Sequence, residues 1–101
     1  MGILDSLFGN KGEQIEEYKA KGAMVIDVRS PGEFQSGHVK GARNIPLQEI
    51  SRRSSEIAHY SKPIILCCAS GGRSGRATSI LKKEGIDCIN GGGWMKVNSY
   101  Y

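Results

Sequence analysis

The chain of 101 residues has no apolar run near the ~20 residues of a membrane-spanning helix, and it has no dense lysine and arginine tract. The first absence predicts a protein without a membrane span. The second, with only 7% aromatic residues, argues against nucleic-acid binding. The three cysteines are an odd number and do not suit a secreted disulfide framework. We therefore expect a cytoplasmic protein.

The first ten residues, MGILDSLFGN, lack the basic and apolar stretches of a signal peptide. They match the myristoylation pattern M-G-x-x-x-[ST] through Gly2 and Ser6. The alternative is an amphipathic opening turn that packs on the domain. Its apolar residues would be Ile3, Leu4, Leu7 and Phe8.

The composition is that of one ordinary globular domain. Apolar residues make up 39% of the chain and charged residues 24%. The formal net charge is +4, which gives a mildly positive field. Such a field favours anionic small molecules or acidic partners.

Short apolar segments alternate with amphipathic ones along the chain. Helices are predicted over 12–22, 30–34, 47–60 and 74–85. Strands are predicted over 23–28, 62–68 and 86–89, with a short strand near 42–45 and a glycine loop over 90–94. Ser30 is the expected N-cap of the second helix, with Pro31 at its first position and Glu33 completing a capping box. The alternation indicates βαβ units and a parallel sheet.

Residues 66–76, LCCASGGRSGR, lie where a predicted central strand passes into a helix. Ligands of parallel sheets bind at the carboxyl ends of the strands. The small side chains allow backbone N–H groups to turn inward, and the helix N-terminus and Arg73 add positive charge. A thiol in that field should have a lowered pKa and be a better nucleophile. The alternative, a small buried apolar residue, suits Cys67 and Cys88.

Two spacings fit the cysteine pair. Counted from Cys67 the loop reads C-x5-R-S, which is typical of cysteine phosphatases. Counted from Cys68 it reads C-x4-R-S, which is typical of rhodanese sulfurtransferases. Both families tend to place a glycine three residues after the nucleophile, and this is Gly71 only in the Cys68 register. Leu66 also stands where phosphatases usually have histidine, so the shorter register is favoured.

Three separate motifs resemble the rhodanese family: VIDVRSPGEFQSGHVKGARNIP, CASGGRSGRA and NGGGW. The similarity spans about residues 13 to 97. It implies an α/β rhodanese-like fold with a central, mostly parallel β-sheet flanked by α-helices. The domain would occupy residues 13–101, after an N-terminal segment of residues 1–12.

The resemblance implies a single-domain sulfurtransferase. Cys68 would attack the outer sulfur of an anionic donor such as thiosulfate to form a persulfide, and it would pass the outer sulfur of that persulfide to cyanide, a small thiol or a protein acceptor. Arg73 would orient or neutralise charge. The persulfide and donor would be cradled by Ala69, Ser70, Gly71, Gly72 and Ser74. The covalent persulfide is the only carrier required, and no metal-ligand spacing is present.

The remaining motif residues are expected to support the site. Asp27 and Arg29 lie at a strand end near the loop, and Glu33 can pair with a loop arginine. His38 is interpreted as a structural hydrogen-bonding residue rather than a base. Trp94 is interpreted as a core residue or a pocket wall.

Two departures from the family pattern bear on function. Many active members have a basic residue directly after the cysteine, where this chain has Ala69, and Arg76 compensates only in part. The chain also ends soon after Trp94, so the last helix is expected to be short or missing, which leaves an apolar edge for the N-terminal segment or a partner to cover. A non-catalytic sulfur-carrier or partner-binding module, and less favourably a cysteine phosphatase or arsenate reductase, stay open as alternatives.

Overall fold

A computed structural model describes residues 10–101 of the chain. The myristoylation pattern through Gly2 and Ser6 lies outside the described residues. So do the apolar residues Ile3, Leu4, Leu7 and Phe8 of the expected opening turn. In the part that is described, no helix is long and apolar enough to cross a membrane.

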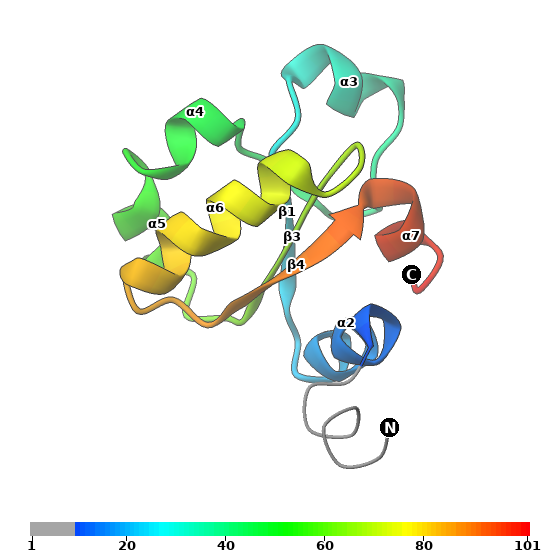
Figure 1. The fold of residues 1–101 in the computed structure, drawn as a ribbon, viewed down its shortest axis with the longest axis horizontal. Coiled ribbons are helices and arrows are strands. Elements are labelled where there is room, and N and C mark those ends of the chain that lie inside the picture. Colours follow the sequence, from blue (N-terminus) through cyan, green and yellow to red (C-terminus); the bar gives the residue numbers. More distant parts are fainter. Residues whose placement is uncertain (1–9) are drawn as a thin grey trace.

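Four strands form one fully parallel sheet in the order β2-β1-β3-β4. The strands are β1 (Met24–Asp27), β2 (Arg43–Asn44), β3 (Ile64–Cys68) and β4 (Cys88–Gly93). The β-branched residues of β1, β3 and β4 are buried on both faces, as central parallel strands require. This confirms the predicted α/β fold, and it places β3 in the interior of the sheet (Figure 1).

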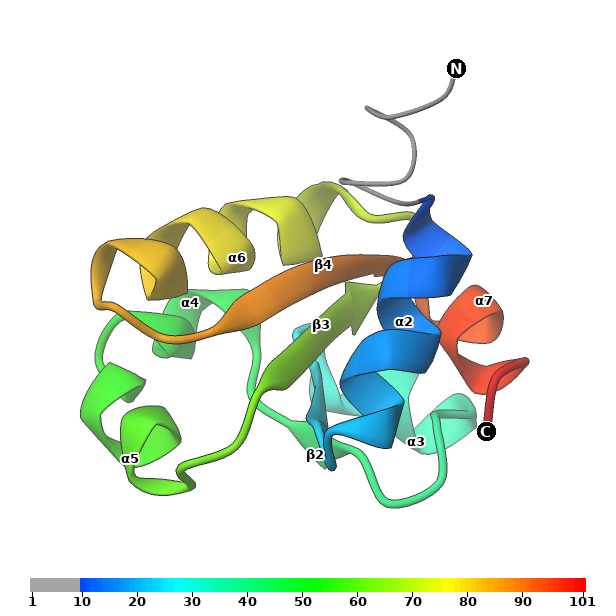
Figure 2. The same ribbon diagram turned by 90° about the horizontal axis from the view of Figure 1, so that it is seen from below.

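Helices cover both faces of the sheet (Figures 1 and 2). One face packs against α4 (Leu47–Ile50), α5 (Ser54–His59) and α6 (Gly72–Lys83). The other packs against α2 (Lys11–Ala20) and α7 (Trp94–Asn98). The remaining short helix, α3 (Pro31–Ser36), follows β1 directly and so lies at the carboxyl end of the sheet.

The predicted capping box of α3 is present. The Ser30 side chain accepts a hydrogen bond from the Glu33 amide, and the Glu33 carboxylate accepts one from the Ser30 amide. Pro31 occupies the first turn, where its missing N–H costs nothing. These contacts fix the direction in which the chain leaves β1, and so they fix where the Glu33 carboxylate lies.

The single helix predicted over residues 47–60 is wrong, because the segment forms two short helices, α4 and α5. Residue Arg53 leaves the helical conformation, with φ −105° and ψ 16°. Serines at 51, 54 and 55 surround the break, and serine competes with helical backbone hydrogen bonds. The apolar spacing was nevertheless informative, since Ile50 and Ile57 are both buried in the same core cluster.

The predicted glycine loop over residues 90–94 is also wrong, because β4 extends through Gly93. A register shift lets Gly92 pair with Cys67 and Gly93 with Cys68. Glycine is needed for this close packing: a Cβ on Gly91 would meet Val97 Cγ2 at 2.7 Å and Ile65 Cγ2 at 2.8 Å. The glycines therefore extend β4 as far as the end of β3, where the cysteine loop begins.

The final helix is short, as predicted, and packs well. Helix α7 has five residues, and its Val97 is fully buried against the sheet. Helix α2 contributes Ile15 to the same cluster. Lys11 of α2 also donates from Nζ to the Asn90 carbonyl at 2.7 Å, which ties this helix to β4.

Candidate active site

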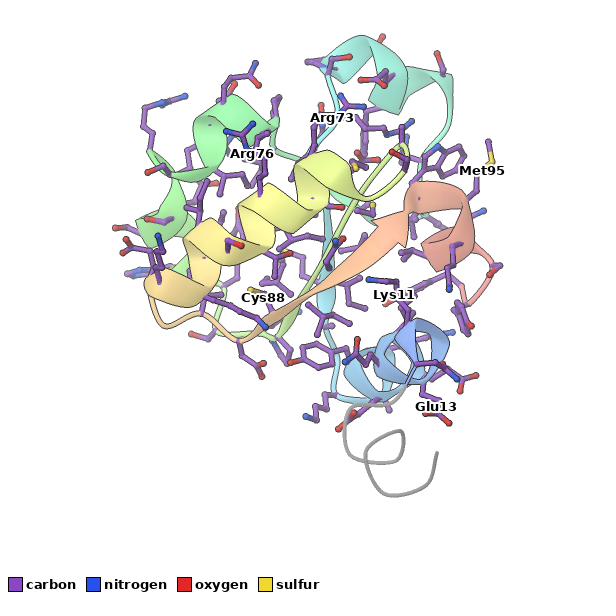
Figure 3. The ribbon with its side chains drawn as sticks, viewed as in Figure 1. Lys11, Glu13, Arg73, Arg76, Cys88 and Met95 are labelled. Atoms are coloured by element: carbon purple, nitrogen blue, oxygen red, sulfur yellow. The ribbon has the colours of Figure 1, made fainter. Side chains whose placement is uncertain are left out.

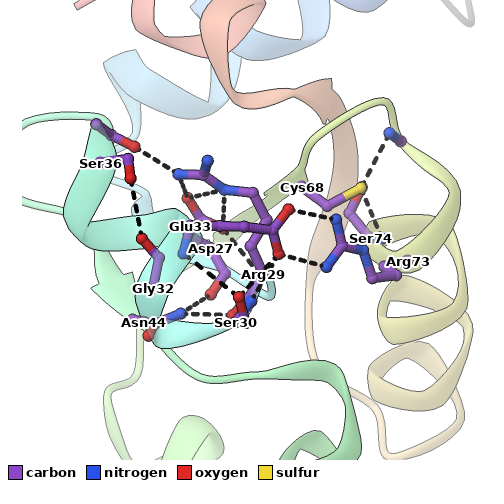
Figure 4. Close-up of polar contacts among 12 residues, drawn as sticks. Asp27, Arg29, Ser30, Gly32, Glu33, Ser36, Asn44, Cys68, Arg73 and Ser74 are labelled. Atoms are coloured by element: carbon purple, nitrogen blue, oxygen red, sulfur yellow. Dashed lines mark hydrogen bonds and ion pairs between the residues drawn. The ribbon is translucent and has the colours of Figure 1, made fainter.

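The predicted site residues gather at the carboxyl end of the sheet (Figure 4). Asp27 ends β1 and Cys68 ends β3. The loop 69–71 leads into the first turn of α6, which holds Gly72, Arg73 and Ser74. Glu33 approaches from α3. The βαβ topology thus brings together residues that are up to 47 positions apart in the sequence, from Asp27 to Ser74.

The Cys68 sulfur accepts hydrogen bonds from the loop and from the first turn of α6. The Gly71 amide lies 3.0 Å from Sγ, and the Ser74 amide lies 3.4 Å from it. The Ser74 hydroxyl lies 3.4 Å from the same sulfur. Of the residues predicted to form the cradle over 69–74, Gly71 at the N-cap of α6 and Ser74 in its first turn thus donate to the sulfur.

These contacts set the protonation of Cys68. Burial of the side chain, which is 1% exposed, works against the thiolate. Hydrogen bonds from the Ser74 hydroxyl and from the amides of Ser74, Gly71 and Ser70 outweigh it, so the pKa of the Cys68 thiol lies below its ordinary value. A lowered pKa is what a nucleophilic thiol needs at neutral pH.

The other two cysteines have the opposite environment. Burial, followed by the nearby Asp27 carboxylate, raises the pKa of Cys67 to about 12. Burial raises the pKa of Cys88 to about 11, and this thiol belongs to the first residue of β4 and lies in the core (Figure 3). Cys67 packs in the cluster on the α2 and α7 side of the sheet, whereas the loop donors converge on Cys68. The phosphatase spacing, which starts at Cys67, therefore begins at a buried core thiol.

The backbone of the loop requires glycine where it turns. Gly71 has φ +108° and serves as the N-cap of α6. A Cβ on Gly93 would meet the Ala69 carbonyl oxygen at 2.9 Å, so β4 and the loop touch through backbone. Ala69, Ser70 and Gly72 are exposed, so they line the mouth of the loop.

Arg73 is paired with Glu33, as predicted for a loop arginine. Its two terminal nitrogens lie 2.8 and 3.0 Å from the two carboxylate oxygens (Figure 4). The hydrogen bonds from Arg73, and then those from Ser30, lower the pKa of Glu33 to about 2. This bidentate pair joins α3 to α6 across the loop and offsets the Arg73 charge. Arg76, one turn further along α6, is exposed (Figure 3).

Asp27 and Arg29 form a buried ion pair below the loop. The carboxylate receives hydrogen bonds from Arg29 Nε at 2.9 Å and from Arg29 Nη2 at 2.7 Å. Arg29 also donates to the Gly37 carbonyl at 2.6 Å, and its guanidinium lies 4.9 Å from the centre of the Trp94 ring. The pair therefore joins the end of β1 to the end of α3 and to Trp94 of α7.

His38 and Trp94 have the structural environments predicted for them. The His38 ring stacks on Phe34, and its Nδ1 lies 2.7 Å from the Phe34 carbonyl oxygen. Trp94 is partly buried against the cluster between α2, α7 and the sheet.

One residue at the site was not predicted from the sequence. The Asn90 side chain accepts from the Ser74 hydroxyl at 2.7 Å and donates to the Gly71 carbonyl at 3.1 Å. The sequence did contain one indication of its role: Asn90 is an amide residue directly after the apolar Cys88 and Ile89, where a buried strand is expected to continue. Among the described residues, no group of three or more His, Cys, Asp and Glu side chains could hold a metal ion.

The structure combines a parallel α/β sheet with a cysteine at the carboxyl end of a central strand, and the thiol of this cysteine receives amide hydrogen bonds from the loop that follows. This arrangement is typical of a class of α/β proteins that use a thiolate as nucleophile. Within that class, the chain belongs to the Rhodanese-like domain family, whose profile matches residues 11–99. This finding confirms the rhodanese resemblance of the three sequence motifs.

Two curated relatives and one solved structure show the extent of the similarity. The uncharacterized protein YqhL of Bacillus subtilis (strain 168) is 49% identical over 72 residues, which cover 69% of this chain and 56% of YqhL. Thiosulfate sulfurtransferase PspE of Escherichia coli (strain K12) is 36% identical over 72 residues, or 70% of this chain and 69% of PspE. The structure "rhodanese with anions from E. coli" has a TM-score of 0.66 at 36% identity, covering 73% of this chain and 89% of that one.

Proposed function

We propose that this protein is a sulfurtransferase that carries sulfane sulfur as a persulfide on Cys68. The observation that carries the proposal is the convergence of Gly71 and Ser74 donors on the Cys68 sulfur. Donors in these positions stabilise a thiolate before reaction and a persulfide anion after it. The curated name of PspE, a thiosulfate sulfurtransferase, supports thiosulfate as a donor.

The first half-reaction loads the cysteine. The Cys68 thiolate attacks the outer sulfur of thiosulfate, and a new S–S bond forms at Sγ. The bond between the two sulfur atoms of thiosulfate breaks, and sulfite leaves with its electron pair. The Gly71 and Ser74 donors support this step, because they stabilise the attacking Cys68 thiolate.

The second half-reaction removes the sulfur from Cys68. The carbon of cyanide, or the sulfur of a thiolate acceptor, attacks the outer sulfur of the persulfide. The S–S bond breaks, thiocyanate or a new persulfide leaves, and the Cys68 thiolate is regenerated. No bound cofactor takes part in this scheme, since the covalent persulfide carries the sulfur.

Thiocyanate formation from thiosulfate and cyanide tests the proposal. The wild-type protein should turn over, and Cys68→Ser should lose turnover by at least about a thousandfold, because the nucleophile is gone. Cys88→Ala is the matched control, since that thiol is buried away from the loop. A folded wild-type protein that forms neither thiocyanate nor a persulfide would contradict the proposal.

The charge of the loop favours a second candidate, a sulfur carrier loaded by a thiol persulfide. Ala69 brings no cation to the mouth of the loop, and Arg73 is held by Glu33. A dianionic donor such as thiosulfate therefore gains less attraction here than in a loop with a free cation. The acceptor of such a carrier would be a thiol, including a protein thiol.

Donor preference separates the two candidates. A carrier should form the Cys68 persulfide faster from a small thiol persulfide than from thiosulfate, with negligible turnover on cyanide. In Ala69→Lys the new cation should lower the KM for thiosulfate by about threefold or more at low salt, with little effect on the thiol persulfide. Equal loading by both donors, together with brisk thiocyanate turnover, would favour the thiosulfate sulfurtransferase.

A further inference from the structure

The Asn90 side chain lies behind the cysteine loop, on β4. It stands opposite Leu66 of β3, immediately before the register shift that pairs Gly92 with Cys67. Strand irregularities of this kind re-aim a side chain, and they are frequent beside active sites. Here the side chain points toward the loop and the first turn of α6.

Asn90 makes three hydrogen bonds there. Its Oδ1 accepts from the Ser74 hydroxyl at 2.7 Å and from the Gly92 amide at 2.9 Å. Its Nδ2 donates to the Gly71 carbonyl at 3.1 Å. Both the donor and the acceptor ends of the amide are therefore used, so its orientation is fixed by its partners.

The residues that Asn90 holds are the ones that hold the sulfur. Gly71 and Ser74 donate to Cys68 Sγ, and these two are tied to Asn90. The tie to Gly71 matters because that residue has φ +108° and is followed by Gly72, so the local backbone has little stiffness of its own. Because the glycine backbone is conformationally free, contacts from another element are needed to keep the loop N–H groups directed at the Cys68 sulfur.

The Ser74 hydroxyl adds a second link. It has one proton and two acceptors within reach: Asn90 Oδ1 at 2.7 Å and Cys68 Sγ at 3.4 Å. Asn90 thus fixes the Ser74 rotamer and keeps the oxygen beside the sulfur. A protonated Cys68 can donate to that oxygen, whereas the thiolate or persulfide anion can take the hydroxyl proton instead.

We infer that Asn90 is a positioning residue of the sulfur cradle, which acts on Cys68 through Gly71 and Ser74 and keeps their donors aimed at the sulfur. The effect of Asn90 on sulfur transfer rests on the proposed function. Its effect on the Cys68 thiolate does not, because that effect follows from the hydrogen bonds alone. Asn90 carries no charge, so its removal changes the thiolate through hydrogen-bond geometry and not through a lost ion.

The test is the pH dependence of Cys68 alkylation by iodoacetamide, with the alkylated residue located by peptide mass spectrometry. Asn90→Ala should move the midpoint of the rate profile upward and slow alkylation at neutral pH by about three- to tenfold, because the aimed donors are loosened. Persulfide formation from thiosulfate should slow by at least as much. Ile89→Val, the neighbouring core substitution on β4, is matched in position and should leave the midpoint unchanged.

Two additional variants keep the test decisive. Asn90→Leu is close to Asn in size, loses all three hydrogen bonds to Ser74, Gly92 and Gly71 and adds no charge, so it should also raise the midpoint. It serves alone if Asn90→Ala does not fold. The effects of Asn90→Ala and Ser74→Ala should be less than additive in the double variant, because they share one path to the sulfur.

The outcomes are distinct from those of the proposed function. Unchanged alkylation profiles in both folded Asn90 variants, with lower thermal stability only, would overturn the inference and leave sulfur transfer intact. A shifted profile in a protein whose wild type forms no persulfide would support the positioning role and overturn the sulfurtransferase instead.

Discussion

The thiols of Cys67 and Cys68, neighbours in the chain, pack on opposite faces of the central sheet. Successive side chains of a strand point to opposite faces, so the adjacent Cys67 and Cys68 side chains at the end of β3 point away from each other. Cys68 receives the loop donors, and Cys67 enters the core beside Ile65 and Val97. One residue of register thus decides which thiol receives the loop donors.

The first prediction compares substitutions of the two cysteines. Cys68→Ser should abolish sulfur transfer with little loss of stability. Cys67→Ser should retain transfer but unfold more easily, by about 1–3 kcal/mol, because it buries a hydroxyl in an apolar cluster. Thiocyanate assays and urea unfolding of the two variants check this. Equal loss of transfer in both, with folding unchanged, would contradict the assignment of the nucleophile.

The second prediction concerns pH. The thiolate is the reactive form, so the rate of persulfide formation should be low at acidic pH and rise to a plateau as Cys68 deprotonates. Because its pKa is lowered, the midpoint should lie below the free-thiol value of about 8.5. Cys67 and Cys88, with pKa values of about 12 and about 11, should add no second rise below these values. A midpoint at or above the free-thiol value would contradict the role of the loop donors.

The third prediction concerns the Arg73–Glu33 pair. The Glu33 carboxylate, with a pKa of about 2, is ionised throughout any assay near neutral pH. Glu33→Gln keeps an acceptor for the α3 capping box but removes the charge that offsets Arg73. The KM for thiosulfate should fall by about two- to fivefold at low salt, and the gain should shrink as salt is added.

A matched control exists on α5. Glu56, which is exposed, is likewise paired with an arginine, Arg53, and its pKa is also lowered to about 2, mainly by its hydrogen bonds with Arg53. Glu56→Gln should leave the KM for thiosulfate unchanged. A KM that rises in Glu33→Gln, or that falls equally in Glu56→Gln, would show that the pair does not limit donor affinity.

The fourth prediction concerns the buried pair below the loop. Asp27 is fully buried and Arg29 is 5% exposed. Asp27→Asn leaves the Arg29 charge uncompensated, which should cost about 3–5 kcal/mol of unfolding free energy. Glu17→Gln, which breaks the exposed pair with Lys21, should cost less than about 1 kcal/mol. Similar costs for the two substitutions in urea unfolding would argue against a supporting role for Asp27.

Much of this site could be predicted because its signals are local. The Ser30 capping box, the Cys68 register and the glycine at position 71 each depend on residues a few positions apart, where spacing determines geometry. The pairing of Glu33 with a loop arginine was predicted through the rhodanese motifs, since it joins residues that are 40 positions apart.

The predictions that were wrong, and the residue that was not predicted, depend on backbone geometry that the spacing of residues in the sequence does not determine. A run of three glycines is typical of a loop, yet Gly91, Gly92 and Gly93 continue β4, because the packing against Ile65, Val97 and Ala69 leaves no room for a Cβ. Asn90 was missed for the same reason, since its role depends on the strand that the glycines extend. The break at Arg53 likewise lies within an apolar pattern that remains continuous across it.

The location of the sulfur tests the central claim most directly. The protein is treated with thiosulfate, digested without reductant, and the peptide that contains Cys67 and Cys68 is fragmented in a mass spectrometer. If Cys68 carries the sulfur, one added sulfur atom is expected on Cys68 in the wild-type protein and in Cys67→Ser, and none in Cys68→Ser. A folded protein with no added sulfur, or with the sulfur on Cys67, would contradict the assignment of Cys68.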